Sequence, residues 1–408
     1  MSGFVGVLFV IIVVAYLCRQ VFAEKRRKDA VLRVQISRSI ADFTLFGVRT
    51  LADRLILRAT PNLRLHTAFD IINSFTTTDE EVHSRFLGLA KLVIRNKGNG
   101  GWVEASRIAE SALDLTVSHI KFDWPFLPLA PLVRIFSFIV TLNLLFSANP
   151  KTMDLRQARI ATEIINRLWL QSKGKPEPIL LVDQERLHNA LKALLPACYP
   201  WDDEGNPLNL IMPAYETMWR VVVLTFVSAA YQGVTLRALN DSREGLCLYP
   251  PTKRVYRAYP SMPGNSGICS PAAADVERCH REPSIWGPDA LEFKPARFCR
   301  SHVLTDDMKQ AYMPFGAGKH VCPAAAGFGH RTIILLVVTL AKHFGTIESG
   351  LRIRDGDVAL PRSPRSLLPS GREDMEGWTL EGTNSIDRGS VCEDGLESIS
   401  AETVEDVM

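Results

Sequence analysis

The sequence predicts a mainly helical protein carried on one N-terminal membrane helix. Residues 130–146 and 208–231 are apolar stretches with the length of buried helices, and a third runs from Pro323 to about Phe344. The first stretch resembles a membrane span. However, it is only 17 residues long and carries Arg134, which favours a buried helix. A further apolar run at the N-terminus predicts the membrane helix.

This N-terminal run contains no charged residue from Gly3 to Cys18, and Val21-Phe22-Ala23 extends it to residue 23. A basic cluster, residues 24–28, follows the run, and no basic residue precedes it. A cleaved signal peptide normally has its basic residues before the apolar core. The positive-inside rule therefore predicts a signal anchor over residues 1–23, with the rest of the chain on the cytosolic side, at the endoplasmic reticulum.

The composition of the remaining chain is that of an ordinary globular protein, with 47% hydrophobic and 22% charged residues among 408. The formal charge of +3 and the lack of a long basic stripe argue against a nucleic-acid partner. After Leu380 the sequence is acidic and rich in Ser and Thr, which predicts a disordered tail over residues 381–408. One folded body over residues 24–380 remains between anchor and tail.

Eight cysteines are present without a Cys-x-x-Cys pair, so a chemically special cysteine must be found from its neighbours. Cys322 follows a loop in which Gly316 and Gly318 permit tight turns. Pro323 suits the first position of a helix, and this places Cys322 at a helix N-terminus, where the macrodipole favours a thiolate. A thiolate on such a loop is suited to bind a haem iron.

Other interpretations of the cysteine are weaker. A lone cysteine at a helix start is most often a small buried residue. A zinc site built from His320, Cys322 and His330 lacks a fourth ligand at a usual spacing. A dinucleotide-binding loop requires a third glycine where Val321 stands. The pattern therefore favours haem ligation.

Segment 314–327 resembles the haem-binding loop of cytochromes P-450, Phe-x-x-Gly-x-(Arg or His)-x-Cys-x-(Gly or Ala). The matching residues are Phe315, Gly318, His320, Cys322 and Ala324. The resemblance covers about residues 25–380 and is strongest after 240, closest to fungal microsomal members. It implies a cytochrome P-450 fold with a small β subdomain and haem b bound axially by Cys322. It also implies that Phe315 packs near the sulfur and that His320 pairs with a haem propionate.

Two further segments support this resemblance. Residues 280–298 resemble the stretch that ends in Pro-x-Arg-Phe, here with Arg297. Pro213-Ala214-Tyr215-Glu216-Thr217 resembles the oxygen-activating motif Ala-Gly-x-Asp/Glu-Thr. An acid and a hydroxyl beside a helix opened by a proline hold water and relay protons, which makes Glu216 and Thr217 the catalytic candidates. The alternative places Glu216 on an exposed face and lets Thr217 bond back to its own helix.

A third segment departs from the family pattern. Glu244 begins a stretch that resembles the Glu-x-x-Arg helix and its Pro-Pro turn, but Cys247 stands in the place of the arginine. The resemblance implies a buried charge network between Glu244 and Arg297, and losing one member typically costs about 3–5 kcal/mol. Only 27 residues separate Thr217 from Glu244. The Trp-x-x-x-Arg signature for the second propionate is not evident, and Arg134 is the candidate substitute.

The resemblance implies a monooxygenase that inserts one oxygen atom from O₂ into a lipophilic small molecule, with secondary metabolism as the expected setting. Because the chain has no flavin or nicotinamide loop, electrons must come from a separate membrane-bound NADPH–cytochrome reductase. Cys247 and the short 217–244 connection leave open a catalytically impaired relic or truncated product. A haem-thiolate isomerase or dehydratase is the third alternative, which Thr217 disfavours.

Overall fold

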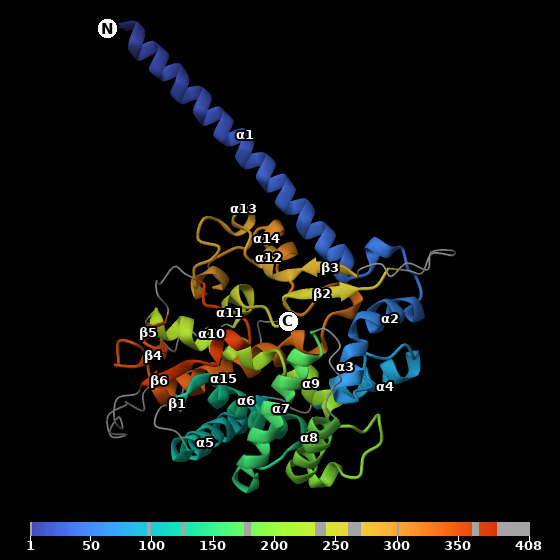
Figure 1. Cartoon of the computed structure of the whole chain (residues 1–408). Helices are drawn as coiled ribbons and strands as arrows, with labels where there is room; N and C mark the ends of the chain where they lie inside the picture. The colour runs from blue at the N-terminus through green and yellow to red at the C-terminus, as the bar shows by residue number, and fades with distance from the viewer. Residues whose placement is uncertain are drawn as a thin grey trace.

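The computed structural model describes residues 2–95, 99–123, 127–174, 181–232, 242–259, 271–299, 302–360 and 367–381. Figure 1 shows a helical body from which one long helix, α1 (Ser2–Ala41), projects. The predicted tail lies outside the described residues, apart from Glu381. Within the described parts, helices outnumber the short strands, so the expectation of a mainly helical fold with small sheets is confirmed.

Helix α1 runs without a break through the predicted anchor and into the body. Its first half exposes large apolar side chains, including Val7, Phe9 and Ile11. Its second half buries Ala30 and Val34 against the body. The predicted anchor thus coincides with the part of α1 that projects in Figure 1.

The other helices lie in the body. They are α2 (Leu51–Ala59), α3 (Leu63–Phe69), α4 (Glu80–Arg95), α5 (Asn99–Asp123), α6 (Leu129–Phe146), α7 (Leu155–Gln171), α8 (Leu181–Leu194), α9 (Leu208–Tyr215), α10 (Met218–Tyr231), α11 (Arg243–Leu248), α12 (Val276–His280), α13 (Pro283–Trp286), α14 (Asp306–Ala311) and α15 (Phe328–Phe344).

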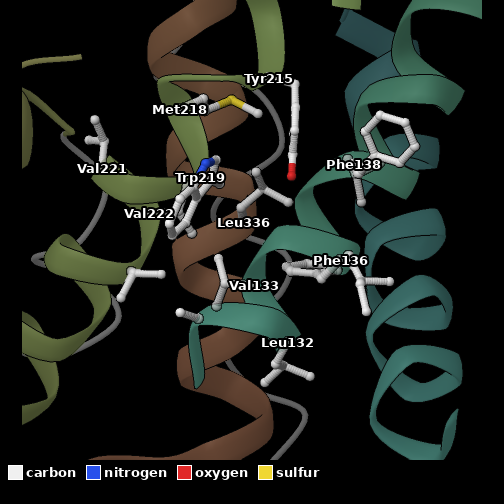
Figure 2. Packing of buried hydrophobic residues seen from close by; sticks show 14 of the residues in the cluster. Leu132, Val133, Phe136, Phe138, Tyr215, Met218, Trp219, Val221, Val222 and Leu336 are labelled. Carbon is white, nitrogen blue, oxygen red and sulfur yellow. The ribbon is translucent and has the colours of Figure 1, made fainter. Parts of the chain in front are cut away.

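The main core forms where α6 meets α5, α7, α9 and α10, and α15 packs against α5 and α10. Figure 2 shows Val133 of α6, Trp219 of α10 and Leu336 of α15 in this cluster. Two described helical stretches, Leu129–Phe146 and Leu208–Tyr231, are long and apolar enough to cross a membrane, but 83% and 72% of their residues are buried in the body. The prediction that residues 130–146 form a buried helix is therefore confirmed.

Two small sheets flank the helices. The antiparallel order β1-β6-β4-β5 joins β1 (Leu127–Pro128), β6 (Trp378–Glu381), β4 (Arg352–Asp355) and β5 (Val358–Ala359). The second sheet pairs β2 (Arg254–Arg257) antiparallel with β3 (Ala272–Asp275), and both strands contact the C-terminal half of α1. This second sheet brings Arg257 close to the end of α1.

The apolar stretch 208–231 forms two helices, with Glu216 and Thr217 in the turn between α9 and α10. Pro213 has no N–H group, so the carbonyl of Asn209 four residues earlier loses its helical partner. The Asn73 side chain fills this place, because its Nδ2 donates to the Asn209 carbonyl over 3.1 Å. The predicted opening of the helix is therefore present and is stabilised from outside the helix.

Candidate functional site

The cysteine loop is a tight turn whose two ends are joined by hydrogen bonding. The Cys322 N–H donates to the Phe315 carbonyl over 3.0 Å. Gly316 and Gly318 have φ angles of 86° and 67°, in the region that favours glycine. A Cβ at Gly318 would also lie 2.6 Å from the Cβ of Asp42, so no larger residue fits. These constraints fix the backbone that presents Cys322.

The expected long helix directly after Cys322 is absent. Pro323–Ala326 form a single 3-10 turn, Gly327 breaks it with a φ of 115°, and α15 begins only at Phe328. The macrodipole of α15 therefore does not act on the sulfur. Burial raises the pKa of the Cys322 thiol, and the hydrogen bond from the Ala324 N–H lowers it by less. The prediction that Cys322 lies at the N-terminus of the long helix is therefore corrected, because a 3-10 turn and Gly327 separate the two.

A buried basic cluster lies beside the loop. We use this name for Arg58 of α2, His83 of α4, Arg257 of β2 and His320. Arg58 Nη2 lies 3.1 Å from His83 Nδ1, and the rings of His83 and His320 lie 6.2 Å apart. Arg58 and His83 are each 5% exposed and Arg257 is 7% exposed. Three segments that are distant in the sequence thus bring basic side chains to His320.

The basic cluster forms no ion pair with a carboxylate of the described residues, although Arg257 donates to the carbonyls of Ala41 and Tyr256. Burial lowers the pKa of Arg58 to about 10, and burial followed by repulsion from Arg58 lowers that of Arg257 to about 9. Among the described residues, the buried Nε atoms of Arg58 and Arg257 and the Nε2 of His320 have no hydrogen-bond partner. Because buried donors are nearly always paired, this arrangement is suited to hold an anion.

Arg134 is bound elsewhere. Its guanidinium forms a two-pronged ion pair with Glu376, with Nη2 donating to Oε2 over 3.0 Å, and it lies 5.3 Å from the centre of the Trp219 ring. The Glu376 carboxylate neutralises the charge of Arg134. The structure does not bring Arg134 to the cysteine loop. The expectation that Arg134 serves as the second propionate partner is corrected: Arg58, His83 and Arg257 lie beside His320 instead.

Glu216 and Thr217 lie together at the α9–α10 turn. Glu216 is 1% exposed and pairs with Arg372, which also donates to the Glu216 carbonyl over 3.0 Å. The Thr217 hydroxyl has no hydrogen-bond partner within the part of the chain that the structure describes, and it caps no helix. The alternatives of an exposed carboxylate and a back-bonded hydroxyl therefore do not apply.

The structure brings Glu244 and Arg297 together, with Arg297 Nε 3.3 Å from Glu244 Oε2. Asp289, which the sequence did not single out, also faces Arg297 at 3.4 Å. Burial raises the pKa of Glu244 to about 7 and outweighs the attraction of Arg297. The Cys247 thiol does not bind the Glu244–Arg297 pair. Its Sγ donates instead to the carbonyl of His280 over 3.4 Å. Arg297 thus serves two carboxylates, and Lys294 supports both: its ammonium lies 2.7 Å from Asp289, and its backbone N–H donates to Glu244 over 2.9 Å.

His280 links this network to the cysteine loop. Its Nε2 accepts the Met313 N–H over 2.9 Å. Its Nδ1 lies 3.3 Å and 3.2 Å from the carbonyl oxygens of Leu246 and Cys247, so Nδ1 is the donor. The ring is fully buried. The sequence contained no signal for this role, because the contacts join segments 33 residues apart on either side.

Known proteins share both the loop region and the fold. The cytochrome P-450 family model matches residues 274–348, which include the cysteine loop. Cytochrome P-450 71A18 of Arabidopsis thaliana is 41% identical over 69 residues, 17% of this chain and 13% of that protein. The cytochrome P-450 monooxygenase xanG of Aspergillus fumigatus is 31% identical over 146 residues, 33% of this chain and 26% of that protein.

A solved structure of a cytochrome P-450 OleT variant in complex with arachidonic acid matches the whole fold. The TM-score is 0.54 at 14% identity, and the match covers 81% of this chain and 85% of that chain. These matches support the cytochrome P-450 family for this chain. The chain spans about an eighth to a quarter of the length of the curated relatives that it matches in sequence.

The cofactor of the cytochrome P-450 family is haem with a cysteine-bound iron, and the residues of this chain fit it. Cys322 is half-buried on the matching loop. The basic cluster offers three buried nitrogen atoms without acceptors to the two propionate groups. A bound metal deprotonates a coordinating thiol by itself, so the raised pKa of free Cys322 does not oppose ligation.

Proposed function

We propose that this cytochrome P-450 is a haem-thiolate monooxygenase that inserts one oxygen atom from O₂ into a lipophilic small molecule. The observation that carries the proposal is the constrained loop of Cys322 beside a buried basic cluster without an anion. Haem with a thiolate ligand supplies the activation of O₂, because the thiolate favours cleavage of the O–O bond. Electrons come from a separate NADPH–cytochrome reductase.

The side chains of this chain would have defined tasks. Cys322 supplies the sulfur, and the basic cluster holds the propionates through charge-assisted hydrogen bonds. At the α9–α10 turn the free Thr217 hydroxyl is available to bind water. Glu216 is held by Arg372, and it delivers protons toward Thr217 when this ion pair opens. Phe315 and the two glycines shape the loop beneath the cofactor.

The cellular setting is also part of the proposal. The exposed apolar first half of α1, followed by basic residues, supports a single-pass anchor in the endoplasmic reticulum with the body in the cytosol. The fungal relative xanG is named a monooxygenase, and the structural neighbour was solved with a long-chain fatty acid. The first name supports a monooxygenase and the ligand of the second supports a lipophilic substrate, and secondary metabolism is the setting that we propose.

A second candidate function is a catalytically impaired cytochrome P-450. It is favoured by Cys247, which leaves one arginine for two carboxylates in the Glu244 network. Such a protein would hold haem weakly and consume NADPH slowly or not at all. A haem-thiolate isomerase or dehydratase is less well supported, because Thr217 with its free hydroxyl serves the oxygen chemistry that those reactions lack.

The reduced, CO-bound absorption spectrum of the full chain tests the proposal. We expect the strongly red-shifted Soret band of thiolate-ligated haem, together with NADPH consumption when the reductase is added. Cys322→Ala should lose the band, whereas Cys299→Ala, at an exposed cysteine, should keep it. Protein that stays colourless after haem is supplied, or a spectrum unchanged by Cys322→Ala, would overturn the proposal. Normal haem spectra without turnover would select the impaired protein.

A further inference from the structure

A second group of cations gathers around the ring of Trp169, near the end of α7. The guanidinium of Arg64 lies 4.7 Å from the ring centre, the ammonium of Lys173 5.0 Å and the guanidinium of Arg372 5.2 Å. Arg372 also lies 5.5 Å from the ring of Trp219. Three separate segments thus direct a positive charge at one aromatic side chain.

Two more cations meet this group at Ser370. Arg220 of α10 donates to the Ser370 carbonyl over 3.4 Å, and the Lys253 ammonium donates to its hydroxyl over 2.7 Å. Desolvation, followed by repulsion from Arg372, Arg64, Arg220 and Lys253, lowers the pKa of Lys173 to about 8. The five cations therefore act on one another, and we call them the Trp169 cluster.

Carboxylates neutralise only part of the Trp169 cluster. Arg372 pairs with Glu216, and Lys253 lies 3.2 Å from Glu277. The three other cations have no ion pair with any carboxylate of the described residues. They are Arg64, Lys173 and Arg220. Glu277 attracts Arg220 without forming an ion pair with it. Like charges held close together repel one another, so an anion bound among these cations would be stabilised.

Unpaired hydrogen-bond donors in the Trp169 cluster also indicate that an anion is the missing partner. The Arg220 Nε and the Trp169 Nε1 are buried and have no partner within the described part of the chain. Both atoms are donors and neither can accept a hydrogen bond, so an acceptor is what both require. Buried donors are almost always paired in folded proteins. The ligand that satisfies them is a group of oxygen atoms with negative charge.

The Trp169 cluster adjoins the turn to which we assigned the oxygen chemistry. Arg372 binds both the side chain and the carbonyl of Glu216, and Arg220 lies three residues after Thr217 on the first turn of α10. The two tryptophan rings and the buried core of α10 provide apolar surface next to these charges. A ligand held here by an acidic group can therefore lie with its apolar part along the turn.

We propose that the Trp169 cluster binds the acidic group of the substrate, and that the substrate is an apolar molecule that carries a carboxylate or a phosphate. This inference rests on the proposed function and names the substrate class of that same site. The cations of the cluster select the anion, whereas the Thr217 turn faces the part of the molecule to be oxidised.

The test compares probes that differ only in the acidic group. Haem-loaded full-length protein in a non-ionic detergent is titrated with dodecanoate, dodecyl phosphate and dodecanol, by the Soret shift and by calorimetry. We expect one of the two anions to bind at least about tenfold tighter than dodecanol, the effect of about one charge-assisted hydrogen bond. The anion that binds tighter identifies the acidic group.

Variants locate the effect in the Trp169 cluster. Arg64→Gln and Lys173→Gln should each reduce the anion preference several-fold and leave dodecanol binding unchanged. Neither residue binds a backbone carbonyl of another element, so the fold should remain intact. Arg159→Gln, on the same helix α7 as Trp169 but paired with Glu163, is the matched control and should keep the preference.

Equal binding of anions and alcohol in the unaltered protein would overturn the inference. It would also be overturned if Arg159→Gln lost as much anion preference as Arg64→Gln and Lys173→Gln. The calorimetric result does not depend on the spectrum of the haem. An anion preference in protein without a thiolate Soret band would support the anion site and overturn the proposed function. A normal Soret band without anion preference would support the proposed function and overturn the anion site.

Discussion

At the scale of single residues, the most consequential departure from the family pattern is Cys247. The Glu244 carboxyl is 1% exposed and must share Arg297 with Asp289. Burial raises the pKa of Glu244 to about 7 and outweighs its contacts with Arg297 and with the Lys294 N–H. The pH dependence of stability should therefore report on this residue.

The first prediction concerns Glu244. Its folded pKa of about 7 lies above the ordinary value of 4.5, so the folded state holds the proton longer and stability falls as pH rises from about 4.5 to 7. At about 1.36 kcal/mol per pKa unit, this shift amounts to roughly 2 kcal/mol between pH 5 and pH 7, and Glu244→Gln should remove it. Denaturant unfolding at pH 5 and pH 7 measures it, and Glu163→Gln, at an exposed acid, should show no such difference.

The second prediction adds the missing cation. Cys247→Arg places a guanidinium next to Glu244, so haem occupancy should rise and the pH dependence just described should weaken. Occupancy is measured from the Soret absorbance per protein. An unchanged occupancy in a variant that melts at the same temperature would show that the missing charge is not the defect.

The third prediction concerns His280, whose ring accepts the backbone N–H of Met313 just before the cysteine loop. Replacing it with Phe leaves the buried Met313 N–H without an acceptor, which costs about 1–3 kcal/mol. We expect lower stability together with faster loss of haem to apomyoglobin. His188→Phe, at a half-buried ring on α8, is the control. Lower stability with normal haem retention would contradict a role in positioning the loop.

At the scale of elements, the break between α9 and α10 is set by two residues far apart in the sequence. Pro213 removes one helical hydrogen bond, and Asn73 supplies a replacement to the same Asn209 carbonyl. Neither residue alone explains why Glu216 and Thr217 lie in a turn. The opening is a property of the pair, and the catalytic proposal depends on it.

The fourth prediction is a double-mutant cycle on this pair. Asn73→Ala should destabilise the protein by about 1–3 kcal/mol, because the Asn209 carbonyl is left unpaired. In a Pro213→Ala background the restored N–H can bind that carbonyl, so the cost of Asn73→Ala should shrink. Urea unfolding measures both values. Equal costs in the two backgrounds would show that the proline and the asparagine are independent.

At the scale of the whole molecule, α1 belongs to two environments. Its first half exposes apolar side chains, whereas Ala30 and Val34 are part of a core cluster and Arg33 pairs with Glu282 over 2.6 Å. One continuous helix therefore joins the proposed membrane segment rigidly to the body in Figure 1. The position of a truncation should decide what is lost.

The fifth prediction separates these two roles. Protein lacking residues 1–23 should keep its melting temperature but leave the membrane fraction. Protein lacking residues 1–34 should lose stability as well, because burial of Val34 alone contributes about 1.5–3 kcal/mol. Carbonate extraction and thermal unfolding measure the two effects. Membrane retention of the shorter deletion would contradict an anchor confined to residues 1–23.

The sequence by itself indicated the family and its haem cofactor, and it singled out Cys322 as the proposed ligand. These depend on local patterns, since the turns at Gly316 and Gly318 and the spacing to Cys322 lie within a few residues of one another. It also determined that residues 130–146 form a buried helix, because apolar length and composition are properties of one segment.

Only the tertiary structure decided which charges meet. Arg58, His83 and Arg257 surround His320, and Arg134 pairs with Glu376, because chain folding joins segments with no regular spacing in the sequence. It likewise decided that α15 begins after Gly327, where a positive φ angle ends the preceding turn. Turn chemistry is local and readable from the sequence, whereas the pairing of charges depends on closing long loops, which no short pattern encodes.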